Sequence, residues 1–237
     1  DVHGEPYRIP EDVEEQRRIV AVLDEAFEGL ARARAHAEAN LRNVRELFRA
    51  HLLEAVRQPK SHWKAMQVSE TVRKVRVTRK VQRKDYLDRG EFPIVSQEAA
   101  LISGYWNTVS DVVRVSRPIV VFGDHTRVVK YVDFDFVVGA DGVQLMSPIP
   151  EIEPAFYYFS LRCIELSGKG YARHYSLLKK EHFLFPPDTT EQKRIAAELQ
   201  EFERLIDSLA TEYESKLQSI EDLRQSLLQR AFAGNLM

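Results

Sequence analysis

The sequence is poor in cysteine and in long apolar runs, and both shortages narrow the class of protein. Among 237 residues there is one cysteine, Cys163, so an internal disulfide is excluded and a reducing compartment fits. No stretch approaches the roughly 18 uncharged apolar residues of a membrane span, and the first residues do not resemble a signal peptide. We therefore expect a cytoplasmic protein without membrane contact.

The motifs of common enzyme classes are also missing. The sequence has no Gly-Lys-Ser/Thr phosphate-binding loop, no Gly-x-Gly-x-x-Gly, no His-Glu-x-x-His and no cysteine pair. The segment "FPPD" at 185–188 lacks the Asn and the Tyr of the Asn-Pro-Pro-Tyr motif of adenine methyltransferases. We expect neither catalysis nor a bound cofactor or metal in this chain.

The charges are unevenly distributed along the chain. Residues 59–187 hold 19 Lys and Arg against 14 Asp and Glu, whereas the two flanks together hold 15 against 22. A basic middle segment between acidic ends indicates an anionic partner for the middle segment.

The two flanks repeat each other. The segment "EEQRRIVAVL" at 14–23 matches "TEQKRIAAEL" at 190–199, and the match at this offset of 176 residues extends over about fifty residues. Each copy opens with proline and aspartate, a helix-start signal, and continues with apolar residues in 4-3 steps that are typical of a coiled coil. The predicted interface residues are Ile19, Leu23, Leu30, Val44 and Leu47 in the first copy and Ile195, Leu199, Phe202, Ile206, Leu209, Ile220, Leu223 and Leu227 in the second.

This spacing predicts two helices of about 44 residues that pair in antiparallel orientation. One polar residue interrupts the pattern at the same place in both copies, Asn40 and Lys216. Between the helices, short β-rich runs such as "IVVFG" and "GVQLM" and one helix from Pro154 to Leu166 predict an α+β unit with an antiparallel or strongly curved sheet. The expected domains are a first helical region at 1–58, a globular recognition domain at 59–187 and a second helical region at 188–237.

Three segments of the middle domain are candidates for contact with DNA. The run at 73–84 has seven Lys and Arg among twelve residues and no acid, which favours phosphate contacts. The loop at 169–180 mixes aromatic and cationic side chains around Gly170, and the turn after Gly123 carries donors that can contact base edges. The candidate residues are Arg73, Lys74, Arg76, Arg79, Lys80, Arg83, Lys84, His125, Thr126, Arg127, Lys130, Lys169, Tyr171, Arg173, His174, Tyr175 and Lys179.

Two other functions remain open at this point. Asp124 and His125, with Asp133 and Asp135, could serve a metal-dependent nuclease, although Asp124 and His125 are adjacent in a turn and the other two share one strand face. A coiled-coil adaptor that binds no DNA is the second alternative.

The chain resembles the DNA-specificity subunits of type I restriction-modification systems. The resemblance covers nearly the whole chain, and its most specific elements are Pro-Pro-x-x-x-Glu-Gln-x-Arg-Ile at 186–195 and Ala-Phe-x-Gly-x-Leu at 231–236. It implies a target recognition domain for one half of a bipartite double-stranded DNA site, in a prokaryotic cytoplasm. It also implies docking of methyltransferase subunits and of a restriction subunit, with S-adenosylmethionine, ATP and Mg bound by those partners.

One departure from the family concerns the number of domains. Members have two target recognition domains, whereas this sequence has one, and the segment before Pro10 aligns with the tail of such a domain. We therefore expect either the C-terminal half of a specificity subunit or a natural half-length version, which would pair with a second copy as a homodimer.

Overall fold

The structure, a computed structural model, describes residues 10–57, 60–166 and 173–234. It divides into a helical unit, which comprises the chain up to Ala50 and from Glu201 onward, and a globular unit, His51–Gln200. Two long helices supply residues to both units: α1, Val13–Arg57, has 45 residues and α4, Thr189–Phe232, has 44, as the sequence predicts. In the described part of the chain, no helix has an apolar stretch of the length that crossing a membrane requires.

The repeated sequence produces the same helix start twice. Asp12 and Asp188 each accept a hydrogen bond on Oδ1 from the backbone N–H two residues later, at 3.0 and 2.8 Å. Gln16 and Gln192 each donate from Nε2 to the carbonyl oxygen of the proline six residues earlier, at 2.6 and 2.8 Å. The aspartate satisfies a backbone N–H that a helix N-terminus would leave without a partner, and the glutamine ties the preceding proline to the first turn, so the shared residues produce a shared helix start.

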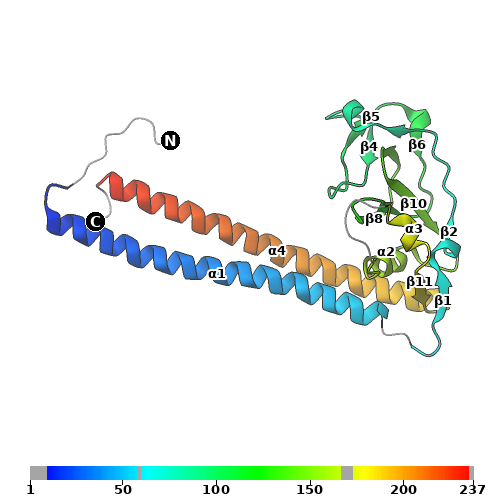
Figure 1. Ribbon diagram of the computed structural model, residues 1–237, viewed down its shortest axis with the longest axis horizontal. Helices are drawn as coiled ribbons and strands as arrows, with labels where there is room; N and C mark the ends of the chain where they lie inside the picture. Colours follow the sequence, from blue (N-terminus) through cyan, green and yellow to red (C-terminus); the bar gives the residue numbers. More distant parts are fainter. Residues whose placement is uncertain (1–9, 58–59, 167–172, 235–237) are drawn as a thin grey trace. The chain divides into compact units, whose positions relative to one another are not determined.

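In the helical unit, α1 and α4 lie side by side in opposite directions (Figure 1). In three contacts between the helices, residues earlier in α1 contact residues later in α4, which confirms the antiparallel prediction. One contact is between two stacked rings whose centroids lie 6.2 Å apart, and the other two are ion pairs with N–O distances of 3.0 and 3.6 Å. These pairs are Phe48 with Phe202, Arg45 with Glu214, and Arg34 with Glu221.

The interface between these helices differs from the predicted 4-3 pattern at one repeated position. Leu47 is 56% exposed, and the prediction that it lies in the interface is wrong. Leu223, which occupies the same place in the second copy, is 50% exposed and lines the edge of a hollow between the two helices. An α-helix with 3.6 residues per turn drifts ahead of a strict 3.5-residue repeat, so the buried stripe moves one residue on, to Phe48. Leu41 is partly buried beside Asn40, and Asn40 and Lys216 line one hollow between the two helices, where the sequence predicts a shared polar interruption. The other predicted interface residues are buried or partly buried: Ile19, Leu23, Leu30, Val44, Ile195, Leu199, Phe202, Ile206, Leu209, Ile220 and Leu227.

The described residues of the globular unit form three sheets. The first sheet is antiparallel, with the strand order β2-β10-β7-β8, and the third is the pair β1-β11. The second sheet has the order β3-β9-β4-β5, with β6 also paired to β9. It includes the parallel pairs β3–β9 and β4–β9, which the sequence did not predict. The strands are β1 Lys64–Gln67, β2 Val72–Arg73, β3 Lys80–Val81, β4 Phe92–Val95, β5 Gly104–Trp106, β6 Val112–Val113, β7 Ile119–Gly123, β8 Val129–Val132, β9 Phe136–Gly139, β10 Val143–Pro148 and β11 His182–Phe185. The main core lies between the first two sheets, with Val95, Val121 and Phe136 at its centre.

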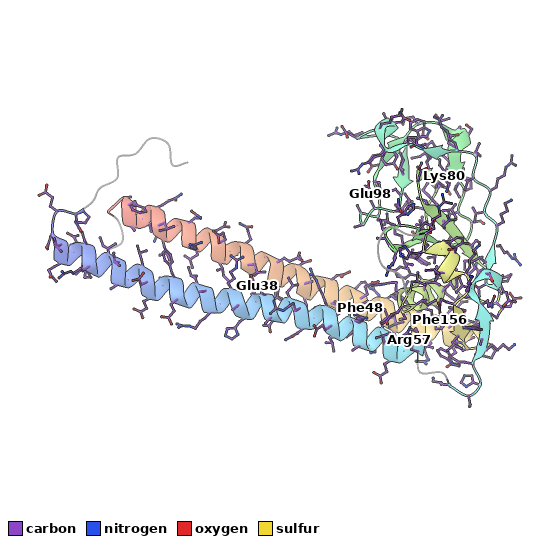
Figure 2. The ribbon with its side chains drawn as sticks, viewed as in Figure 1. Glu38, Phe48, Arg57, Lys80, Glu98 and Phe156 are labelled. Carbon is purple, nitrogen blue, oxygen red and sulfur yellow. The ribbon has the colours of Figure 1, made fainter. Side chains whose placement is uncertain are left out.

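Short helices complete the globular unit. They are η1 Val68–Glu70, η2 Arg83–Asp85, η3 Val109–Asp111, α2 Pro154–Arg162 and α3 Tyr175–Leu178. Proline at the first turn and the Glu153 carboxylate, which accepts from Phe156 N, start α2 where the sequence predicts a helix. Phe156, labelled in Figure 2, packs edge-on against Trp63 and Phe183 with ring centroids 5.9 and 6.1 Å away, and this aromatic contact anchors α2 on β11.

The start of α4 is built into the globular unit through Gln192. This side chain is fully buried, and its Oε1 accepts from Glu153 N at 2.7 Å. Its Nε2 donates to Glu151 O at 2.9 Å and to Pro186 O at 2.8 Å. One amide therefore joins the α2 start, the end of β11 and α4.

Candidate nucleic-acid interface

The structure brings two of the three candidate segments to one hollow on the globular unit. The hollow has a volume of about 400 Å³, and it lies between the segment after β2, strand β10 and the α3 segment. Four cationic side chains line it, and no acidic residue does so in the described part of the chain. The lining residues are the cations Arg73, Lys74, Lys80 and Lys179, the polar Ser69, Gln144 and Tyr175, and the apolar Val72, Val75, Val77, Val143 and Leu145. A lining that combines cationic, polar and apolar side chains suits the sugar-phosphate backbone and base edges of a nucleic acid.

The basic run does not act as one strip of charge. Lys80, labelled in Figure 2, lies at the hollow and donates from Nζ to Val143 O at 2.8 Å, so it also fixes β10. Arg79 stacks its guanidinium on Trp106 at 5.6 Å, and Arg83 pairs with Glu98 at 3.1 Å. Arg76 and Lys84 are exposed without a place in the hollow. The basic run therefore supplies three cations to the hollow, which are Arg73, Lys74 and Lys80.

Residues 125–127, in the turn after β7, form hydrogen bonds with the neighbouring loop at 96–100 and with Leu166. His125 N donates to Gln97 Oε1 at 3.2 Å, and the Thr126 hydroxyl donates to Gln97 O at 2.6 Å. Arg127 has a left-handed φ of 61°, and its guanidinium donates to Leu166 O at 3.3 Å. These three residues position the loop at 96–100 and the end of the α2 segment, and their contact with DNA stays a prediction.

Lys130 has a structural place, which corrects its assignment as a DNA contact. It is 5% exposed, and its Nζ donates to Ser96 O at 2.8 Å and also to Ala100 O. Burial lowers the pKa of Lys130 to about 8, against the opposing charge of Glu98. Its ammonium group is enclosed by the loop that it holds, so it presents no surface to a phosphate.

The α3 segment is attached to the same turn through Asp124. Tyr175 N donates to Asp124 Oδ1 at 2.7 Å, and His174 N donates to Asp124 O at 2.9 Å. His174 is 1% exposed with its Nδ1 3.0 Å from Asp124 O, so burial corrects its assignment as a DNA contact. Arg173 is exposed, and the Lys179 ammonium lies 5.3 Å from the centre of the Tyr175 ring. Lys169 and Tyr171 lie outside the described residues.

Burial raises the pKa of the Tyr175 hydroxyl, and the charge of Asp124 adds to this effect. At neutral pH the hydroxyl is therefore protonated and can both donate and accept a hydrogen bond at the hollow.

The residues of the metal-nuclease alternative have other partners. Asp124 is 6% exposed and holds Tyr175 N. Asp135 pairs with Arg114 at 2.6 Å and accepts from Val115 N at 2.8 Å, and the Val115 N–H and the Arg114 guanidinium hold the pKa of Asp135 below its usual value. Among the residues that the structure describes, no three His, Cys, Asp or Glu side chains are grouped as metal ligands.

Sequence reasoning missed Gln144, which lies at the hollow on β10. It stands within the β-rich run "GVQLM", which by itself predicts only a strand. A polar residue at a partly buried strand position was the available signal.

The chain was compared with known proteins. No family model and no curated protein sequence matches it. Among solved structures, a chain of a type I R-M system, studied for complex assembly and conformational transition, matches with a TM-score of 0.77 and 20% identity. The match covers 96% of this chain and 61% of that one. The HsdS subunit from Thermoanaerobacter tengcongensis matches with a TM-score of 0.55 and 18% identity, over 94% of this chain and 59% of that one.

Both matches extend over both helices and the globular unit, and this chain spans about three fifths of the length of either neighbour. The chain therefore has the fold of the specificity subunits of type I restriction-modification systems.

Proposed function

We propose that the globular unit binds double-stranded DNA and recognises the bases of one half of a bipartite target. In this proposal the chain is the non-catalytic specificity subunit of a type I restriction-modification complex. The observation that carries it is the single hollow where the cations of the basic run meet Tyr175 and Lys179, in a chain with the specificity-subunit fold. Phosphate contacts would position the duplex, and polar side chains would discriminate bases.

Methyltransferase subunits would dock on the helical unit, and a restriction subunit would join them. The repeat exposes the same leucine on each helix, Leu47 and Leu223, so the helical unit offers two equivalent apolar positions to two copies of a partner. S-adenosylmethionine, ATP and Mg would be bound by those partners.

A second recognition domain would pack on the start of α1. In the second copy, Ala196 is 3% exposed because the globular unit covers it, whereas the equivalent Val20 in the first copy is 55% exposed. Gln16 makes the same proline contact as Gln192. In the second copy, Gln192 also bonds the start of α2, so Gln16 is the equivalent residue that would bond the start of such a helix in a second domain. A second copy of this chain would supply that domain if the chain acts at this length.

Light scattering tests this pairing. The expected result is a dimer whose dissociation constant rises at least tenfold on Val20→Asp, since a charge would enter the proposed contact. Val22→Asp is the matched control, because Val22 is 47% exposed and corresponds to the exposed Glu198 in the other copy. A wild-type chain that stays monomeric at every concentration, or equal effects of the two variants, would contradict the pairing.

Selection from a randomised duplex pool tests the DNA proposal. The purified chain is expected to enrich one short sequence, with affinity that falls steeply as salt rises because phosphate contacts release counterions. Recovery of random sequences at every salt concentration would refute sequence recognition. Methyl transfer or cleavage by the isolated chain would refute the non-catalytic role, and loss of cleavage on Asp124→Ala would favour the nuclease.

A further inference from the structure

One residue that lines the hollow, Gln144, carries an uncommitted amide. Strand alternation directs Val143 and Leu145 of β10 toward the main core and places Gln144 on the opposite face. Gln144 lies opposite Phe122 on β7, and the Phe122 ring lies 6.3 Å from the Tyr175 ring. The amide is therefore held on a strand and lines the same hollow as Tyr175 and the four cations.

The other polar groups around the hollow are less suited to a bidentate contact with one base, since even the Tyr175 hydroxyl offers a single oxygen. Lysine ammonium groups only donate hydrogen bonds, and Lys80 already bonds Val143 O. The Ser69 hydroxyl donates to Gln67 Oε1 at 3.4 Å. A carboxamide both donates and accepts, and that of Gln144 has no hydrogen-bond partner in the described part of the chain.

A second glutamine nearby shows the contrast. The Oε1 of Gln97 accepts from His125 N, and its side chain lies within 3 Å of the position that a Cβ on Gly142 would take. Gln97 is therefore fixed within the protein. Gln144 keeps both ends of its amide available at a surface that attracts phosphates.

We propose that Gln144 is a specificity-determining residue, which makes a bidentate contact with one base of the target, adenine being the base whose N6 and N7 its amide matches in the major groove. The cations at the rim would hold the flanking phosphates and so bring the base edge to a fixed distance from β10. This inference rests on the proposed DNA recognition and assigns one base position to one residue.

The test repeats the duplex-pool selection with Gln144→Ala and Gln144→Glu. Gln144→Ala should lower the preference at one position, where wild type prefers adenine, by about 5- to 150-fold, which is the 1–3 kcal/mol of one bidentate pair at 1.4 kcal/mol per tenfold. Gln144→Glu should remove the adenine preference at that position, because a carboxylate only accepts hydrogen bonds, and should weaken binding to all duplexes by repelling phosphates. Both variants should keep the wild-type melting temperature, since no internal bond of the side chain is lost.

Gln82→Ala is the matched control, since Gln82 is exposed, makes no capping bond with its side chain and lies outside the hollow. This variant should keep the wild-type preferences. If Gln144→Ala keeps the wild-type preferences, or weakens all duplexes equally without changing them, the assignment is overturned while the proposed function stands. If wild type itself enriches no sequence, the proposed function fails and the assignment with it.

Discussion

Gln192 and Gln16 occupy the same place in the repeat but should differ strongly in their contribution to stability. Gln192 is fully buried and makes three hydrogen bonds, whereas Gln16 is partly buried and makes one. Gln192→Ala would leave the partly buried Glu153 N–H and two carbonyl oxygens without these partners. An orphaned buried group costs about 1–3 kcal/mol, and water can reach some of the space, so we expect a loss of about 2–4 kcal/mol. Gln16→Ala should cost about 0.5–1 kcal/mol.

Tryptophan fluorescence during thermal unfolding measures the effect of Gln192→Ala, and circular dichroism of the helices measures that of Gln16→Ala, because Gln16 belongs to the helical unit. Both tryptophans, Trp63 and Trp106, belong to the globular unit, and Trp63 packs against Phe156, so the signal reports on this unit. For a unit of this size, a loss of 2–4 kcal/mol corresponds to a fall in melting temperature of about 4–16 °C. Equal shifts for the two variants, or a loss below about 1 kcal/mol for Gln192→Ala, would refute the assignment of Gln192 as the residue that joins α2, β11 and α4.

Three further outcomes follow from the packing, charge and burial of individual residues. Leu30→Asp should destabilise the helical unit by about 2–3 kcal/mol in a circular dichroism melt, whereas Leu47→Asp, at a position 56% exposed, should change it by less than about 0.5 kcal/mol; the reverse order would contradict the shifted interface. Arg73→Ala combined with Lys74→Ala should reduce the salt slope of DNA binding by about two, without altering which bases are preferred. Because the folded pKa of Lys130 is about 8 and its ordinary value is 10.5, the unfolded chain binds more protons between these values, so stability should rise from pH 8 to pH 9.5; Lys130→Met should abolish this rise in the urea midpoint.

The helical part of the fold could be predicted from the sequence because its signals are local and occur twice. Proline, aspartate and glutamine at fixed spacing define both helix starts, and the apolar period defines the pairing. The error at Leu47 arose because an ideal heptad was assumed over 45 residues, where the helical period itself drifts. The parallel β3–β9 and β4–β9 pairs join short strands distant in sequence, and no local signal specifies such pairs.

The candidate site was predictable in composition and only partly in geometry. Residue type alone could not separate Lys74, which lies at the hollow, from Lys130, which is buried under carbonyl oxygens. The same limit applies to His174, which is buried next to Asp124. It also applies to Gln144, because its place in a strand does not reveal that cations from other segments line the same hollow. These distinctions depend on tertiary contacts between segments that are tens of residues apart.

The affinity ratio between two duplexes tests the central claim most directly. One duplex carries the sequence enriched by the wild-type chain, and the other has the same bases in shuffled order, so both have equal charge. At about 0.1 M salt we predict at least tenfold tighter binding to the enriched duplex, and a ratio that persists as salt rises while both affinities fall. Equal affinities for the two duplexes at every salt concentration would contradict DNA sequence recognition by this chain.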